Sequence, residues 1–175
     1  MLGASRAASR PSGRRKVECQ DMFEESIDDF ISRWLRYAVA IQLFPHLEGS
    51  PLLECQAGAA IIQIFERTGP YLSLPGPAKA ILNPMVAGLE LVEGGQKELT
   101  VTGVSRLRGT GLIIDRETPM VVVDTGILLV IGVQQLSDDL GIGDWVAFEA
   151  IPPIHGFIVT EERGFSLRVD DDESL

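Results

Sequence analysis

Aromatic residues, cysteine and histidine are scarce in this chain, and long apolar runs are missing. Aromatic residues make up 6% of the 175 residues, so a core must be built from Val, Ile and Leu, which favour strands. The two cysteines, Cys19 and Cys55, are too few for a disulfide framework and are expected to be reduced intracellular thiols. No apolar run reaches the length of a membrane-spanning helix, and no signal-peptide core follows the basic start. These absences predict a globular, intracellular protein without a membrane partner.

The sequence also lacks the motifs of the common catalytic and metal sites. No G-x-S-x-G, Walker, H-E-x-x-H or calcium-loop pattern occurs. His46 and His155 have no second histidine or cysteine at metal-ligand spacing. Neither cysteine has the local residues typical of a catalytic nucleophile. We therefore expect no enzymatic activity, no metal and no cofactor, and we assign no catalytic residue.

Acidic residues exceed basic ones, and the basic residues are unevenly placed. The formal net charge is −10, yet residues 1–18 alone carry five basic side chains. The acidic remainder should repel phosphate backbones and anionic membranes at long range. Residues 1–21 are expected to be a disordered basic tail. Their Ser, Ala and Arg content is also typical of a mitochondrial presequence, so nuclear, cytoplasmic and mitochondrial locations all stay open.

One amphipathic helix is predicted over residues 22–42. Its apolar residues recur at three- and four-residue steps and form one stripe. Acidic residues crowd the start, while Arg33 and Arg36 lie nearer the end, an order that complements the helix dipole. We expect Phe30 and Trp34, both on the stripe, to contact a protein partner.

Beyond Pro45 the apolar residues alternate or form short runs between glycine and proline, a pattern typical of strands. The turn Asp124-Thr125-Gly126 predicts a hairpin. Runs 59–64 and 127–133 lack polar alternation, so both of their faces should be covered, by the other half, by the helix or by a partner chain. An acidic tail is expected at 170–175. The predicted strands are 52–56, 59–66, 78–82, 86–92, 98–107, 111–115, 119–124, 127–133, 144–150, 154–160 and 164–169.

Shifted by sixty-eight residues, the first half of the chain matches the second without a gap. Turn-forming and apolar positions coincide, which is informative because backbone geometry requires Gly and Pro at fixed places. We therefore expect two tandem β units, residues 43–96 and 97–169. The identities are Pro51 with Pro119, Gly58 with Gly126, Leu72 with Leu140, Pro84 with Pro152, Gly88 with Gly156 and Glu93 with Glu161.

Two stretches of the second unit carry a family pattern. Gly109-Thr110-Gly111 begins one apolar strand, and Leu140-Gly141-Ile142-Gly143-Asp144-Trp145 leads into another. In this order the unit resembles the five-stranded OB-type barrel, most closely its cold-shock and S1-like variants. The resemblance implies a mainly β fold class, with two tandem OB-like β-barrel units preceded by one amphipathic α-helix.

The residues of the equivalent binding strands bear on function. Cold-shock-like domains stack bases on aromatic side chains of these strands, and each base stacked contributes roughly 1–3 kcal/mol. Here the strands are aliphatic, at Leu112–Ile114 and Val121–Val123. We therefore expect a non-catalytic protein–protein adaptor or stabilising subunit of a larger assembly, held to a protein partner or a second copy. The alternative is a single-stranded nucleic-acid (RNA) binding module that uses Arg106, Arg108 and Arg116.

Trp145 is the remaining candidate for partner binding. Strand alternation places Trp145 and Glu149 on one face and Val146 and Phe148 on the other. If Val146 and Phe148 fill the barrel, Trp145 faces outward, either exposed or covered by the helix. An outward Trp is a common anchor in protein interfaces.

Overall fold

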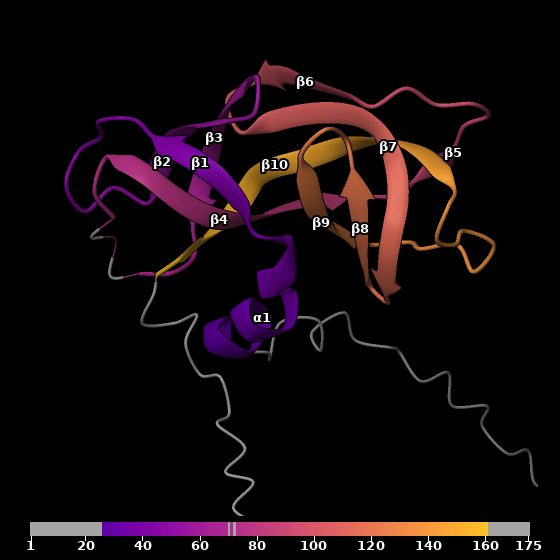
Figure 1. The fold of residues 1–175 in the computed structure, drawn as a ribbon, viewed down its shortest axis with the longest axis horizontal. Helices are drawn as coiled ribbons and strands as arrows, with labels where there is room; N and C mark the ends of the chain where they lie inside the picture. Colours follow the sequence, from indigo (N-terminus) through magenta and orange to yellow (C-terminus); the bar gives the residue numbers. More distant parts are fainter. Residues whose placement is uncertain (1–25, 70, 72, 161–175) are drawn as a thin grey trace, which may run out of the picture.

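The structure is a computed structural model, and it describes residues 26–69, 71 and 73–160. The expected basic tail, the expected strand 164–169 and the expected acidic tail lie outside these residues. Within the described part, one short helix precedes the strands (Figure 1). The elements are α1 (Ile27–Trp34), the 3₁₀ turn η1 (Leu35–Tyr37), β1 (Val39–Leu43), β2 (Leu52–Ala57), β3 (Ala60–Glu66), β4 (Gly76–Val86), β5 (Glu90–Leu91), β6 (Glu98–Gly103), β7 (Arg106–Glu117), β8 (Met120–Asp124), β9 (Leu128–Val133) and β10 (Trp145–Val159).

Helix α1 is shorter than the predicted helix over 22–42. Ser26 caps it, because its Oγ accepts a hydrogen bond from the backbone N–H of Asp29 at 3.1 Å. The helix ends at Trp34, and Val39–Leu43 form strand β1 instead of the last helical turns. Strand β1 pairs with β4 on one side and β2 on the other. These long-range ladders override the helical periodicity of the segment.

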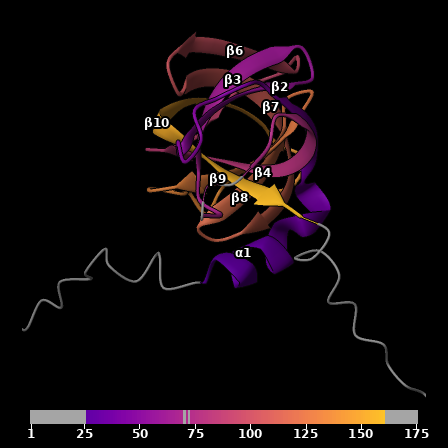
Figure 2. The ribbon, with the colours of Figure 1, turned by 90° about the vertical axis from the view of Figure 1, so that its left-hand side faces the viewer.

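Eight strands close into a barrel. Going around it, each strand pairs with the next in the order β10, β3, β2, β1, β4, β9, β8, β7 and again β10. A further antiparallel ladder joins β4 to β10 directly. The short strands β5 and β6 pair with β10 and β7. A mainly β fold with a closed barrel, preceded by one helix, is therefore confirmed, and Figure 2 shows α1 lying outside the barrel.

Three strands are longer than predicted. β4 covers the predicted strand 78–82 and the start of the predicted strand 86–92. β7 joins the end of the predicted strand 98–107 to the predicted strand 111–115. β10 joins the predicted strands 144–150 and 154–160. The proline pair Pro152-Pro153 indicated a break, but the chain continues through a register shift between Ile151 and His155. Proline, which lacks an N–H donor, is tolerated at such irregularities without ending a strand.

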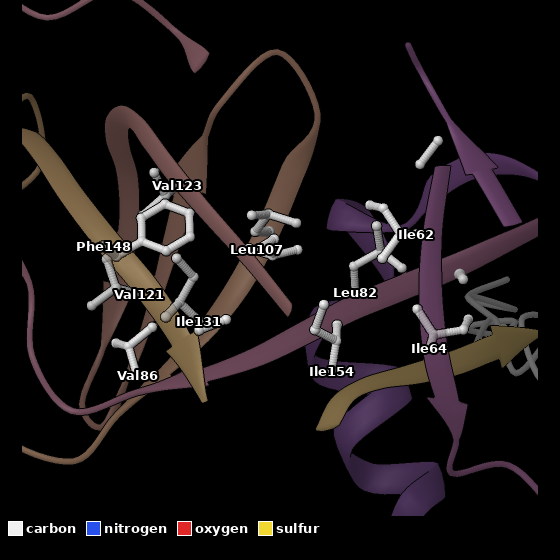
Figure 3. Close-up of a cluster of buried hydrophobic side chains, with 14 of the residues drawn as sticks. Ile62, Ile64, Leu82, Val86, Leu107, Val121, Val123, Ile131, Phe148 and Ile154 are labelled. Atoms are coloured by element: carbon white, nitrogen blue, oxygen red, sulfur yellow. The ribbon is translucent and has the colours of Figure 1, made fainter. Parts of the chain in front are cut away.

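The barrel interior holds a core of aliphatic residues with Phe148. Alternate residues of β2, β3 and β10 point inward, as the burial of Leu53, Cys55, Ile62 and Ile64 shows. Figure 3 shows the core side chains in two groups, one around Phe148 and one around Ile62 and Ile64. The composition therefore produced the aliphatic core that the scarcity of aromatic residues required.

The predicted hairpin at Asp124-Thr125-Gly126 is confirmed. Strands β8 and β9 pair antiparallel on either side of it. The backbone N–H of Thr125 donates to the carbonyl oxygen of Ile127 at 3.1 Å, and that of Gly126 donates to Asp124 Oδ1 at 3.0 Å. Gly126 has a φ of 101°, a conformation that glycine adopts without strain.

A shift of sixty-eight residues relates strands as well as sequence. It carries β1, β2, β3 and β4 onto parts of β7, β8, β9 and β10. The ladders correspond too: β1–β2, β2–β3 and β1–β4 match β7–β8, β8–β9 and β7–β10, and the parallel pair β3–β10 matches the parallel pair β9–β4. Because β4 and β10 pair with strands of both halves, an arrangement of two separate tandem units is not confirmed.

Candidate functional site

The outer face of β8 and β9 is covered by α1. Phe30 and Trp34 pack there together with Ile31, and the ring of Phe30 stacks on Phe157 with centroids 4.3 Å apart. The sheet residues beneath are Ile81, Val122, Val130 and Phe157. Phe30 and Trp34 are therefore buried against the barrel of their own chain, and their contact with a protein partner stays a prediction.

A polar anchor holds the end of this helical segment on β7. Arg36 Nη2 lies 2.6 Å from Asp115 Oδ2, and the hydroxyl of Tyr37 donates to the same oxygen. The hydrogen bond from Tyr37, then those from the Arg116 backbone N–H and Arg36, lower the pKa of Asp115, although burial opposes them. Burial, and then the hydrogen bond to Asp115, raises the pKa of Tyr37. The anchor was missed at the sequence level because Arg36 and Asp115 lie seventy-nine positions apart.

The corresponding outer face of β2 and β3 carries no helix in the described part of the chain. Its central pair is polar: Gln63 Nε2 donates to Glu54 Oε2 at 3.2 Å. Leu52 is exposed, and Ile61 is 53% exposed. The prediction that both faces are covered is therefore confirmed for β9, which forms residues 128–133 of run 127–133. For Ile61 of run 59–64 the described chain supplies no cover, and cover by a partner chain stays a prediction.

Trp145 is half-buried, and its cover differs from the prediction. Val146, Phe148 and Ala150 are buried while Glu149 is exposed, so the predicted alternation is confirmed. The segment between β5 and β6 packs on the indole: a Cβ added at Gly95 would lie 2.1 Å from Trp145 Cε3. Trp145 is thus partly covered by this segment. The aromatic side chains of α1 pack elsewhere, in the cluster around Trp34.

The three predicted nucleic-acid residues do not form one surface. Arg106 and Arg108 are exposed neighbours on the outer face of β7. Arg116 lies eight positions further, about 25 Å along an extended strand. Its side chain is 18% exposed and donates to the carbonyl oxygen of Leu140, with Asp138 3.7 Å away. Arg116 therefore fixes the 134–144 connection and is separated from the other two.

The thiol and imidazole groups of the described residues have structural surroundings. Cys55 points into the core, where burial and, to a smaller extent, Glu54 raise its thiol pKa to about 11. Both ring nitrogens of His46 lie within 3.0 Å of backbone carbonyl oxygens, those of Phe44 and Ser73. Burial and then the charge of Arg67 lower the pKa of His155. Across residues 26–160, apart from 70 and 72, no group of three or more metal-ligating side chains is assembled.

Glu66, which the sequence did not single out, is a buried carboxylate at the end of β3. Its Oε1 accepts hydrogen bonds from Thr68 at 2.9 Å and Ser73 at 2.7 Å. Its Oε2 has no hydrogen-bond partner among the residues that the structure describes. These bonds tie the β3–β4 connection to the barrel, so the group has a structural explanation.

A hollow of about 410 Å³ opens on the outer surface between β5, β7 and β10. Three charged residues surround it, Glu90, Arg108 and Glu149, and Leu89 and Ala147 supply apolar surface. No sequence pattern groups Glu90, Arg108 and Glu149, since they come from three different strands. The one available signal was the face of β10 shared by Trp145, Ala147 and Glu149.

Comparison with known proteins identifies no relative: no family model, no curated protein and no solved structure matches this chain. Within the described residues, none of the helices is long and apolar enough to cross a membrane. What can be inferred about function therefore rests on the geometry of this chain.

Proposed function

We propose that this protein is a non-catalytic adaptor, or a stabilising subunit of a larger assembly, that holds a protein partner on the outer surface of its barrel. The observation that carries the proposal is the unequal cover of two corresponding faces. The chain's own helix packs on β8 and β9, whereas Ile61 and Leu52 on β2 and β3 stay exposed. Leu91, which follows Glu90 in β5, is 60% exposed. Apolar surface of this kind favours a protein interface.

The environment of the reactive groups supports a non-catalytic role. A thiol with a pKa of about 11, buried in the core, is protonated at neutral pH and is a poor nucleophile. The contacts of His46 with two backbone carbonyl groups hold its ring in a structural position. These side chains therefore have better explanations in folding than in catalysis.

We further propose that the barrel is OB-like, of the cold-shock or S1 type, and that it arose by internal duplication. The support is the order of β6 to β10 around Gly109 and Gly143, together with the match between ladders sixty-eight residues apart. An OB-like barrel without aromatic rings on its binding strands fits a protein partner better than a single strand of nucleic acid.

Single-stranded nucleic acid is the second candidate. It is favoured by one observation, the adjacent exposed side chains of Arg106 and Arg108 on β7. Glu149 lies opposite Arg108 on the neighbouring strand, which weakens the attraction for phosphate. Filter binding with single-stranded RNA tests this candidate: salt-sensitive affinity that is lost with Arg106→Ala plus Arg108→Ala would favour it over the adaptor.

The adaptor is tested by purifying the tagged full-length chain from its native cells. We expect a protein to co-purify in stoichiometric amount with the wild type and to re-form the complex from purified components. Ile61→Lys on this exposed face should reduce the binding at least tenfold, and Leu47→Lys, which changes an 82% exposed leucine in the β1–β2 connection, should not. A wild-type chain that is recovered only as a monomer without a retained protein would contradict the proposal.

A further inference from the structure

The hollow between β5, β7 and β10 has charged walls whose charges are not neutralised by contacts within the described chain. Glu90, Arg108 and Glu149 make no side-chain hydrogen bond and no ion pair there. Arg108 and Glu149 are cross-strand neighbours, so a positive and a negative group lie side by side at one wall. With Glu90 opposite, carboxylates outnumber the guanidinium. The hollow therefore favours a ligand whose charge pattern includes a cation.

The same hollow has a counterpart in the covered half of the molecule. A shift of sixty-eight residues carries Ile81 onto Glu149 and Leu89 onto Phe157. Ile81 and Phe157 are paired residues on β4 and β10, and they lie beneath Phe30 of α1. Strand β5, which pairs with β10 beyond the end of β4, corresponds to the last residues of β10. Two residues that line the hollow, Leu89 and Glu149, thus correspond to two of the four sheet residues that lie beneath α1.

The covered half also shows how the helical segment is held. An apolar side chain, Phe30, enters the outer face, and the cations of Arg33 and Arg36 lie 3.5 Å and 2.6 Å from carboxylates of β7, those of Glu117 and Asp115. The hollow offers the same two elements, apolar surface at Leu89 and Ala147 and carboxylates at Glu90 and Glu149. Over the described residues, fifteen acidic side chains stand against eight basic ones, which adds long-range attraction for a cationic segment.

We infer that this hollow binds an amphipathic helix of a partner protein, one that presents an arginine or lysine to Glu90 and Glu149 beside an apolar side chain that contacts Leu89 and Ala147. Arg108 then pairs with an acidic side chain that lies one turn from the basic residue on the bound helix. This pairing disfavours segments that carry only basic residues. The inference rests on the proposed adaptor function and names the chemistry of its partner. The site lies on the paired strands β5, β10 and β7, so we expect the helix to bind without rearrangement of the strands.

The test uses a display library of helical peptides of about eighteen residues, a length at which alanine-based helices form in water, with one randomised face. The full-length chain is the target. We expect selected peptides to carry a basic residue next to an apolar one. With the double variant Glu90→Gln plus Glu149→Gln, the Kd of the selected peptides, measured by fluorescence anisotropy, should rise at least tenfold.

A matched control removes the same charge elsewhere. Glu48→Gln plus Asp139→Asn changes two exposed carboxylates of the β1–β2 and β9–β10 connections, and it should leave the Kd within twofold of the wild type. Equal melting temperatures of both double variants show that the barrel is intact. Peptides selected without a basic residue, or peptides that bind both double variants equally, would overturn the inference.

Two other ligands of the hollow would give different results, and either result would overturn the inference. Displacement of the peptides by single-stranded RNA at low salt, lost with Arg108→Gln, would assign the surface to nucleic acid. A tenfold gain in peptide affinity on deletion of residues 1–25 would assign the hollow to the chain's own basic segment. If a native partner still binds the Glu90→Gln plus Glu149→Gln variant, the adaptor function is supported and the proposed site is wrong. If the peptides behave as expected but no native partner is found, the site binds helices and the adaptor function is wrong.

Discussion

Hairpins β2–β3 and β8–β9 occupy corresponding places in the barrel, yet they differ on one side. Toward the core both bury aliphatic residues, such as Leu53 and Ile62 in one and Val121 and Ile131 in the other. Toward the outside, the cross-strand pair is Glu54 with Gln63 in the first hairpin and Val122 with Val130 in the second. The inner face is set by barrel closure, which is common to both. The outer face is set by whether a helix lies on it.

The polar contacts follow the same division. Asp115, which binds Arg36 and Tyr37 in the covered half, corresponds by the sixty-eight-residue shift to Leu47, an exposed residue. The helix is therefore held by a combination of apolar and ionic contacts that the open half does not reproduce. Variants at matched positions of the two halves test whether this difference holds in solution.

The largest effect is expected from Trp34→Ala. Trp34 is fully buried between α1 and the barrel, and removal of a buried Trp side chain costs about 3–5 kcal/mol in the free energy of unfolding. Ile61→Ala on the open hairpin should change it by less than about 0.5 kcal/mol. Urea denaturation monitored by circular dichroism gives both values. Similar losses for the two variants would show that the open hairpin is covered in solution.

A second comparison uses Gly156 and Gly88, which correspond by the shift. A Cβ at Gly156 would lie 2.5 Å from Ile64 Cδ1 inside the core, whereas one at Gly88 would meet only the carbonyl oxygen of Gln135 at 3.7 Å. Gly156→Ala should destabilise the chain by about 1–3 kcal/mol through overpacking. Gly88→Ala should have little effect in the same denaturation assay, and a large loss there would mean that the rim of the hollow is packed.

Asp115→Asn should lower the free energy of unfolding by about 1 kcal/mol. Asp115 is only 22% exposed, and its carboxylate accepts hydrogen bonds from the charged Arg36 and the neutral Tyr37. Its pKa is lowered in the folded chain, so its contribution is present above the unfolded value of about 3.9 and is lost as the pH falls through the folded pKa. The stability difference between wild type and variant should therefore be constant near neutral pH and vanish in acid. Denaturation curves from pH 7 down to pH 3 measure it, with Asp139→Asn as the exposed control; a difference that grows in acid would contradict this account.

The smallest effect on monomer stability is expected from the double variant Glu54→Val plus Gln63→Val, which gives the open hairpin the residues of the covered one. Both side chains lie on the outer surface, so the free energy of unfolding should change by less than about 0.5 kcal/mol. The added apolar surface should instead promote self-association, seen by analytical ultracentrifugation. A variant that stays monomeric at high concentration would show that this polar pair is not what keeps the open hairpin separate.

Several features of the fold could be predicted because they depend on neighbours in sequence. The hairpin at Asp124-Thr125-Gly126 follows from turn chemistry, and the inward positions of Val146 and Phe148 follow from alternation. The candidate site could not be predicted, because Glu90, Arg108 and Glu149 come together only when β5, β7 and β10 pair. Arg116 was grouped with Arg106 and Arg108 as a basic residue along the surface that binds nucleic acid in OB-type barrels. Its contact with Leu140 depends on a connection folded against β7.

Local patterns in the amino-acid sequence were enough to predict a β-rich chain with an aliphatic core, turns at fixed glycines and two halves with similar spacing of apolar residues. Three features depend on how distant segments pack: Val39–Leu43 is a strand, β4 and β10 pair with strands of both halves, and among the described residues a helix covers only one of the two outer faces. The reason is physical. Periodicity and turn geometry act over a few residues, whereas strand pairing and helix packing depend on which distant segments gain most by burying their apolar surfaces together.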